Sequence, residues 1–159
     1  CPSLLVIGNS DINRKIIHYF SRRKKGKITL ISRNLNEAYP FAMDYGVTLK
    51  SRDEILKAHH YDGIISATTT EEYLVSSLPL DARTRLIIDL SVPRSIDPHL
   101  THNPALTLFN MQQIGDLFVK AHTLRSAEVE QVKKFLETSV LAYTERFQLK
   151  ILNSGKALN

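Results

Sequence analysis

Residues 3–20 read SLLVIGNSDINRKIIHYF, and this stretch decides the fold. It begins with a short apolar run, continues through a turn that opens with Gly8, and ends in a segment whose apolar residues recur at helical spacing. A strand, a glycine-containing turn and a helix in this order form the first unit of a nucleotide-binding α/β domain. We therefore predict a strand over Leu4–Ile7 and a helix over Ile12–Phe20.

Further apolar runs follow, separated by helical patterns or turn residues. They are short and continuously apolar, which is typical of strands buried on both faces of a parallel sheet. The alternation of strands and helices predicts an α/β fold, a Rossmann-type doubly wound parallel sheet. The other predicted strands are Ile28–Ile31, Val47–Leu49, Gly63–Ala67, Leu86–Leu90 and Leu106–Phe109.

Two further helices are expected between these strands. Leu35–Tyr45 has a weak helical pattern, because Pro40 must lie in the first turn or break the helix. Ser51–His59 begins with Ser51 and has Glu54 three residues later, which is the spacing of a capping box.

The pattern changes after Asn110. From Met111 to Leu149 there is no proline, and apolar residues recur mostly three or four positions apart. This predicts one long C-terminal helix over residues 111–150, far longer than the ~11–12 residues of an average helix, and such a helix usually packs on another domain or chain. We expect a Rossmann-type domain over residues 1–110, the long linker helix over 111–150 and a frayed tail over 151–159.

Composition limits the class of protein and its compartment. The hydrophobic fraction of 43% and the charged fraction of 23% are ordinary for a soluble globular protein. No apolar run approaches the ~20 residues that span a membrane, and no signal-peptide pattern is present, so we expect no membrane association. Cys1 is the only cysteine, which favours a reducing, cytoplasmic setting. Because the chain starts without methionine just before a strand, we expect it to be a piece of a longer protein.

The net charge of +5 comes from one cluster. Residues 12–32 carry seven lysines and arginines and no acid, centred on SRRKKGK at residues 21–27. One interpretation is a contact with phosphates, including RNA. The favoured interpretation is a solvated helix end, terminated by Gly26, because no aromatic residues lie between the charges as single-strand binders need.

A dinucleotide-binding turn has glycine at positions one, three and six of G-x-G-x-x-G. Here Gly8 supplies the first, while Ser10 and Asn13 stand at the other two. Gly8 can make the sharp bend, and Ser10 is small and can donate to a phosphate at the helix N-terminus. Asn13 needs room where helix and strand pack, and Asp11 is unfavourable beside a pyrophosphate unless it faces solvent. The turn alone is as consistent with a dinucleotide site as with none.

The end of the second predicted strand adds evidence on the cofactor. NAD-binding domains place an acidic residue there to accept from the ribose hydroxyls. This chain has Ser32, Arg33 and Asn34 instead. Arg33 can pair with a 2′-phosphate, and Ser32 and Asn34 can donate to it. The sequence therefore favours NADPH over NADH, against the alternative of a surface arginine at a strand end.

Three later motifs resemble the glutamyl-tRNA reductase family. Residues 62–72 read DGIISATTTEE, residues 86–98 read LIIDLSVPRSIDP, and residues 106–117 read LTLFNMQQIGDL. The family carries DVVISAT-like, LIDLAVPRDIDP-like and YNIDDL-like segments in the same order, followed by a long spinal helix. The resemblance extends from Leu4 to Phe147 and implies the NADPH-binding domain with much of that helix.

The resemblance also implies the chemistry of a whole enzyme. The family reduces glutamyl-tRNA to glutamate-1-semialdehyde in tetrapyrrole (porphyrin) biosynthesis, with its catalytic cysteine in an N-terminal domain. Because this chain lacks that domain and Cys1 matches no nucleophile motif, no catalytic residue is assigned, and the chain alone is expected to be inactive. The implied partners are glutamyl-tRNA as substrate, a second copy joined through the missing C-terminal domain, and an aminotransferase that accepts the aldehyde.

Carried over by position, the cofactor contacts of the family fall on four stretches of this chain. These are the pyrophosphate turn, the 2′-phosphate segment, the loop near the nicotinamide ribose, and the loop that shapes the nicotinamide pocket. The implied NADPH-binding residues are Gly8, Asn9, Ser10, Asp11, Ile12, Asn13, Ser32, Arg33, Asn34, Ala67, Thr68, Thr69, Val92 and Pro93.

The loop after the fifth predicted strand is expected to be stiff. Pro93 and Pro98 restrict its backbone, and Asp89 and Asp97 can accept hydrogen bonds from its N–H groups. A stiff loop at this edge suits a hydride-transfer pocket, and it also suits a structural turn that positions the sixth strand.

Two other functions stay open. One is another NADP-dependent oxidoreductase of the shikimate dehydrogenase type, against which the SVPRSIDP loop and the long helix argue. The other is a degenerate Rossmann module with an assembly or regulatory role, which only the GNSDIN turn supports. No metal site is predicted, because His59-His60 and the HLTH motif at residues 99–102 have no cysteine ligands nearby.

Overall fold

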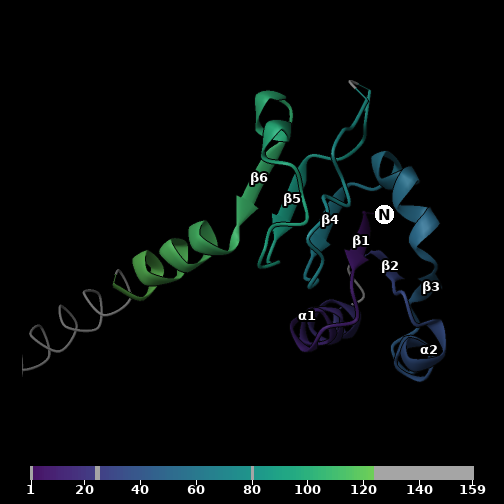
Figure 1. Cartoon of the computed structure of the whole chain (residues 1–159). Helices are drawn as coiled ribbons and strands as arrows, with labels where there is room; N and C mark the ends of the chain where they lie inside the picture. Colours follow the sequence, from purple (N-terminus) through teal and green to yellow (C-terminus); the bar gives the residue numbers. More distant parts are fainter. Residues whose placement is uncertain (1, 24–25, 80, 124–159) are drawn as a thin grey trace, which may run out of the picture. The chain divides into compact units, whose positions relative to one another are not determined.

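The computed structural model describes residues 2–23, 26–79 and 81–123. These residues form a six-stranded sheet in which every neighbouring pair is parallel, with the strand order β3-β2-β1-β4-β5-β6 (Figure 1). The strands are β1 Ser3–Ile7, β2 Lys27–Ile31, β3 Thr48–Lys50, β4 Gly63–Ser66, β5 Leu86–Asp89 and β6 Thr107–Asn110. The α-helices are α1 Asp11–Arg22 and α2 Leu35–Asp44, and the 3₁₀ helices are η1 Arg52–His60 and η2 Pro98–His102.

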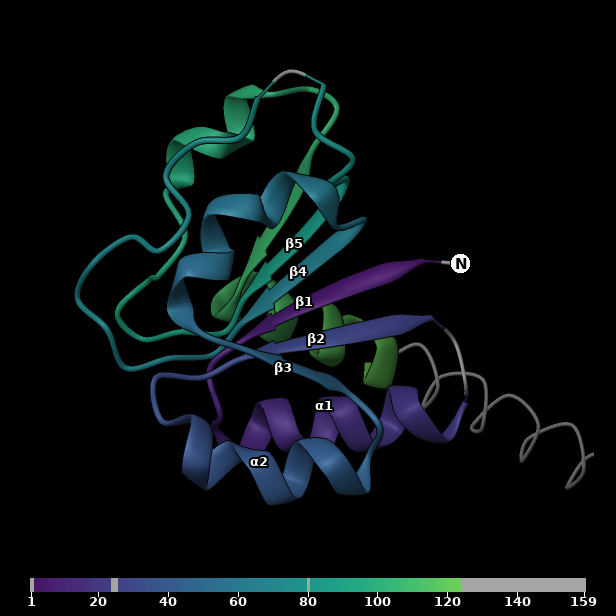
Figure 2. The same ribbon diagram turned by 90° about the vertical axis from the view of Figure 1, so that its right-hand side faces the viewer.

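Helices cover both faces of the sheet. Figure 2 shows α1 and α2 side by side on one face and η1 on the other. Successive side chains of β1 point to opposite faces, so Leu5 packs in the cluster that contains Ile55 of η1 and Leu100 of η2. Val6 packs instead with Ile17 of α1. A central strand that is buried on both sides must be apolar at every position, which is why the SLLVI run is continuous rather than alternating.

The predicted fold class is confirmed. All the predicted strands are present, and each begins and ends within one residue of its predicted bounds. The chain runs from β1 outward to β3 on one side, then crosses back to β4 and continues to β6, which is the doubly wound arrangement. This reversal beside β1 creates the crevice in which such folds bind ligands.

The capping box predicted at Ser51 and Glu54 is wrong. Ser51 makes no side-chain cap hydrogen bond, and its backbone carbonyl accepts from the N–H of Glu54 at 3.2 Å. The segment that follows is a 3₁₀ helix with a kink at Lys57 rather than a regular α-helix. The Glu54 carboxylate reaches forward to Lys57 Nζ at 3.5 Å, so neither side chain of the expected box is used for capping.

The prediction that Pro40 lies in the first turn of its helix or breaks it is also wrong. The helix α2 runs continuously through Pro40. The proline removes the N–H that would bond the carbonyl of Asn36, and Asn36 is exposed, so water can satisfy this carbonyl. Asn34 offsets the loss by capping the helix: its Oδ1 accepts from the N–H of Glu37 at 3.2 Å.

A helix begins at residue 111, as predicted. The Asn110 side chain accepts from the N–H of Gln113, and the Gln113 side chain accepts from the N–H of Asn110, both at 2.9 Å, which is a reciprocal cap. Residues 111–123 are helical, and the rest of the predicted helix and the predicted tail lie outside the described residues. The chain divides into two compact units, residues 1–114 and 115–159, and domain bounds at 110 and 150 stay a prediction. In the described part, no helix has the length and apolarity needed to cross a membrane.

Candidate nucleotide-binding site

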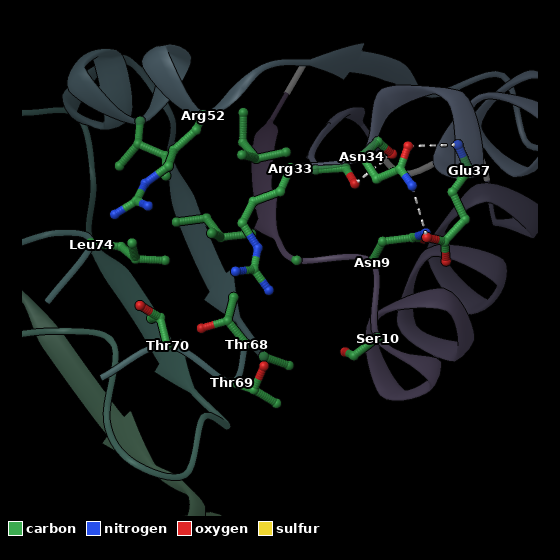
Figure 3. A pocket seen from close by; sticks show the side chains of 16 residues that line it. Asn9, Ser10, Arg33, Asn34, Glu37, Arg52, Thr68, Thr69, Thr70 and Leu74 are labelled. Carbon is green, nitrogen blue, oxygen red and sulfur yellow. Dashed lines mark hydrogen bonds between the residues drawn. The ribbon is translucent and has the colours of Figure 1, made fainter. Parts of the chain in front are cut away.

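A cavity of about 320 Å³ lies at the carboxyl ends of β1, β2 and β4 (Figure 3). Because these parallel strands end at the same edge, the loops that follow them converge there. Nine of the fourteen predicted cofactor-binding residues line it: Gly8, Asn9, Ser10, Ser32, Arg33, Asn34, Ala67, Thr68 and Thr69. The residues that line it but were not predicted are Ile7, Ile31, Glu37, Arg52, Ile55, Thr70 and Leu74.

Gly8 is required by the geometry of the first turn. Its φ is +102°, which side chains rarely adopt, and a Cβ built there would lie 2.5 Å from the carbonyl oxygen of Ala67. Its N–H donates to the carbonyl of Ile31 at 2.9 Å, so the turn is anchored to β2 as well. The backbone therefore passes close to the loop after β4, and no other residue type fits here without strain.

Ser10 and Asn13 stand where the dinucleotide motif has glycine, and the side chains of both make hydrogen bonds within the turn. Ser10 is the N-cap of α1, and its Oγ accepts from the N–H of Asn13 at 3.4 Å. Asn13 is fully buried, and its Nδ2 donates to the carbonyls of Ile7 and Gly8, both at 2.8 Å. The amide thus ties the first turn of α1 to the end of β1, and it uses the room that a glycine would leave between helix and strand.

Asn9 presents a buried donor without a partner. Its Oδ1 accepts from Nε of Arg14 at 3.0 Å, and because arginine only donates, the orientation of the Asn9 amide is determined. Its Nδ2 is buried and makes no hydrogen bond with any described residue. Buried donors without a partner are uncommon in folded proteins, and this one lies in the turn that precedes α1.

The three residues after β2 differ in whether their side chains already have hydrogen-bond partners. Ser32 is buried, and its Oγ donates to the carbonyl of Asn34 at 3.0 Å, while Asn34 caps α2. Arg33 is exposed and makes no hydrogen bond or ion pair with a described residue. Figure 3 shows its side chain extending into the cavity toward Thr68. Arg33 is therefore available to a ligand, whereas Asn34 is held by Glu37 through both its Oδ1 and its Nδ2.

The predicted acceptor role of Asp89 is confirmed. Asp89 is 1% exposed, and its carboxylate accepts from the N–H groups of Ser91, Ser95 and Ile96 at 3.0–3.1 Å. Ser91 Oγ in turn accepts from the N–H of Thr68 at 3.0 Å. Hydrogen bonds therefore lead from the buried carboxylate to the wall of the cavity. Asp97 also accepts as expected, from the N–H of His99 at 2.9 Å.

The remaining predicted contacts do not line this cavity. Val92 is 74% exposed on the loop after β5, and Pro93 follows it, also exposed. Asp11 and Ile12 are exposed at the start of α1, and Asn13 is buried behind the turn. The structure brings together the loops after β1, β2 and β4, and Val92 and Pro93 lie outside this group.

The basic cluster is divided between described and undescribed residues. Lys24 and Lys25 lie outside the described residues. Arg23 stacks over the ring of Tyr19 with its Cζ 3.7 Å from the ring centroid, and its Nη1 lies 3.4 Å from the Tyr19 carbonyl. Arg23 therefore satisfies the C-terminal end of α1, whereas the cavity adjoins the N-terminal end of that helix. In the described part, no group of three or more potential metal-ligating side chains is placed to hold an ion.

Comparison with known proteins shows to which family the chain belongs. Residues 2–117 match the family model described as shikimate / quinate 5-dehydrogenase. A glutamyl-tRNA reductase of Picrophilus torridus is 27% identical over 159 residues, covering 98% of this chain and 39% of that protein. A glutamyl-tRNA reductase of Thermosipho melanesiensis is 25% identical over 92% of this chain and 40% of its own length. The chain thus spans about two fifths of the length of these relatives.

Solved structures give the same relationship. The nucleotide-binding domain of glutamyl-tRNA reductase from Thermoplasma volcanium superposes with a TM-score of 0.65 at 25% identity, covering 79% of this chain and 86% of that chain. Glutamyl-tRNA reductase from Methanopyrus kandleri shares the fold, with a TM-score of 0.68 at 19% identity over 86% of this chain and 36% of that chain. The resemblance read from the three motifs is confirmed. The chain therefore belongs to the shikimate / quinate 5-dehydrogenase family, and its relatives over most of its length are glutamyl-tRNA reductases.

Proposed function

We propose that this chain is the NADPH-binding domain of a glutamyl-tRNA reductase. The single observation that carries the proposal is the cavity at the carboxyl edge of the sheet. There the Gly8 turn and Asn9 line the same space as the guanidinium of Arg33, which has no hydrogen bond or ion pair with a described residue. The family and the curated relatives support a nicotinamide cofactor, and the donor set fits a ligand with several phosphate oxygens.

Each part of the cavity has a role in this proposal. The turn Gly8–Asn13 and the N-terminus of α1 would hold the pyrophosphate. Arg33 would pair with the 2′-phosphate, and this contact would distinguish NADPH from NADH. The loop Ala67–Thr69 would line the ribose on the nicotinamide side, and Val92 and Pro93 would shape the nicotinamide pocket. When bound, the cofactor supplies hydride, and the residues of this chain orient it.

In the whole protein, the domain would serve the reduction of glutamyl-tRNA to glutamate-1-semialdehyde. The contribution of this chain is positioning, since no described residue is assigned a role in acid–base or nucleophilic chemistry. The chain alone is expected to lack reductase activity. The same proposal includes glutamyl-tRNA as the substrate, a homodimer, an aminotransferase that accepts the aldehyde, and a cytoplasmic setting.

Titration of the chain with NADPH and NADH by calorimetry tests the proposal. We expect NADPH to bind and NADH to bind much more weakly, and we expect Arg33→Ala to remove about tenfold of the preference, because a charge-assisted contact to phosphate is lost. Arg22→Ala is the matched control, because Arg22 is an exposed arginine at the opposite end of α1. Failure of both cofactors to bind at millimolar concentration would contradict the proposal.

The second candidate is a Rossmann module that binds no cofactor and serves assembly or regulation. One observation favours it: the Asn13 amide satisfies the carbonyls of Ile7 and Gly8, so the end of β1 is complete without a ligand. The same titration separates the two candidates. Under this second function neither cofactor binds, and Arg33→Ala changes nothing.

A further inference from the structure

The cavity holds a second arginine that the sequence did not reveal as part of the site. Arg52 is the first residue of η1, directly beyond the end of β3, and β3 pairs with β2 at the outer edge of the sheet. Arg52 therefore lines the same cavity as Arg33. Figure 3 shows both guanidinium groups directed toward the side of the cavity where Thr68 and Thr70 lie.

The charges around the cavity are unevenly distributed. Its charged lining residues are Arg33, Arg52 and Glu37. Glu37 lies on the far side, in the first turn of α2, where its Oε2 accepts from Asn34 Nδ2 at 3.3 Å. The two guanidinium groups therefore line the cavity away from Glu37, which is an arrangement suited to a doubly charged anion.

Arg52 forms a weak ion pair with Glu72. Its Nη2 lies 2.8 Å from Oε2 of Glu72, on the loop after β4. The side chains are 49% and 73% exposed, so water screens the pair and its contribution is small. A phosphate group offers a guanidinium two charge-assisted hydrogen bonds and greater negative charge than one carboxylate, so it can displace Glu72.

We propose that Arg52 is the second cation for the 2′-phosphate of the bound dinucleotide and that Glu72 is its internal competitor. This inference rests on the proposed function, since it requires a 2′-phosphorylated adenine nucleotide in this cavity. Among the described residues, Arg33 has no partner to release, whereas Arg52 must exchange Glu72. Binding of the phosphate therefore breaks the contact between η1 and the loop that carries Glu72. Because Glu72 and the phosphate bind the same guanidinium, Glu72 lowers the affinity for the cofactor.

Binding of adenosine 2′,5′-bisphosphate and of 5′-AMP to the chain tests this inference by calorimetry, because the two probes differ only in the 2′-phosphate. We expect Arg52→Ala to weaken the bisphosphate about tenfold and to leave 5′-AMP unchanged, with Arg52→Lys in between. We expect Glu72→Gln to tighten the bisphosphate about two- to fivefold, as an exposed ion pair allows. In the double variant, the effect of Glu72→Gln should vanish, because Arg52 is no longer there to be released.

Two control variants separate competition from general charge. Glu71→Gln removes the neighbouring exposed carboxylate, which has no partner among the described residues, and Lys57→Ala removes a cation of η1 that does not line the cavity. Both should leave the affinity for the bisphosphate within twofold. If Glu71→Gln tightens binding as much as Glu72→Gln, the competition is overturned.

The outcomes also separate this inference from the proposed function. If the chain prefers the bisphosphate and Arg33→Ala removes the preference while Arg52→Ala does not, the role of Arg52 is overturned and the proposed function stands. If the unmodified chain binds both probes equally or neither of them, both proposals are overturned. Loss of the bisphosphate preference in Arg33→Ala and in Arg52→Ala, with unchanged circular dichroism, supports both.

Discussion

Asn13 shows how one residue can satisfy a packing requirement in a different way from glycine. Glycine at this position of the motif lets helix and strand approach closely because it has no side chain. Here the Asn13 side chain fills the gap, and its two donor hydrogens reach the carbonyls of Ile7 and Gly8. Its Oδ1 stays buried without a described partner, so the replacement leaves one polar atom unsatisfied. The spacing of the motif cannot predict this, because it identifies the position but not which way the amide turns.

Asn13→Ala should destabilise the chain by about 2 kcal/mol, because two buried hydrogen bonds are lost and their acceptors are left underused. Asn13→Asp should destabilise it more, since a carboxylate would face two carbonyl oxygens. Urea unfolding followed by circular dichroism measures both changes. Asn36→Ala, an exposed asparagine on α2, should change the free energy of unfolding by less than about 0.5 kcal/mol. Equal stability of Asn13→Ala and the unmodified chain would show that the tie to β1 is dispensable.

At the scale of elements, regular strands were predictable and the connections between them were only partly so. A strand such as β1, Ser3–Ile7, is predictable from its continuous apolar run, because burial on both faces leaves little choice of residue. The prediction that Pro40 lies in the first helical turn or breaks the helix was wrong, and so was the capping box predicted at Ser51 and Glu54. Packing on the sheet and contact with solvent overrode the local rules for helix ends. Arg52 was missed for a related reason: its place in the site depends on β3 lying beside β2, which is a tertiary fact.

The loop between β5 and η2 is organised by one carboxylate, so Asp89→Ala should destabilise the chain by about 3 kcal/mol or more. The change removes the acceptor of four hydrogen bonds from Ser91, Ser95 and Ile96 and leaves buried N–H groups unpaired. Thermal or urea unfolding measures the loss. Asp97→Ala is the matched control: Asp97 accepts from the N–H of His99, and its removal should cost about 1 kcal/mol. Equal effects of the two substitutions would refute a central role for Asp89.

At the scale of the whole molecule, the two ends of the sheet serve different purposes. The carboxyl ends of the strands carry the cavity, and the amino ends are fastened by Asp62, which immediately precedes β4. Its Oδ2 accepts from the N–H of Ser3 at 2.7 Å and from the Ser3 Oγ at 2.8 Å, and its Oδ1 accepts from Arg83 Nη2 at 2.9 Å. This carboxylate connects the start of β1 to the residues before β4 and β5.

These hydrogen bonds, first of all the one from the Ser3 backbone, lower the pKa of Asp62 from 3.8 to about 2. The unfolded chain therefore binds this proton more readily than the folded chain, so the stability that Asp62 contributes is fully present above about pH 4 and is lost as the pH falls toward 2. The difference in unfolding free energy between the unmodified chain and Asp62→Asn should be constant near neutral pH and should shrink across this window. Asp81→Asn, an exposed control on the loop before β5, should give no difference of this kind. A difference that persists unchanged down to pH 2 would contradict the account.

The sequence predicted which residues line the cavity better than it predicted which of their side chains are free to bind a ligand. Gly8 and Arg33 were predicted from their positions after the first two strands of a dinucleotide-binding unit, and Thr68 was implied by the resemblance to the glutamyl-tRNA reductase family. Which of them are free to meet a ligand depends on side-chain hydrogen bonds. Arg33 is free while its neighbour Asn34 is committed to capping a helix, and adjacent positions in the sequence do not reveal that difference.

The lining of the cavity has one more consequence. Every residue that lines the cavity lies between Ile7 and Leu74. The proposed phosphate contacts therefore belong to one consecutive part of the chain, whereas the proposed nicotinamide contacts, Val92 and Pro93, come later. Substitutions that retune recognition of the 2′-phosphate can therefore accumulate without changing the loop that would shape the nicotinamide pocket.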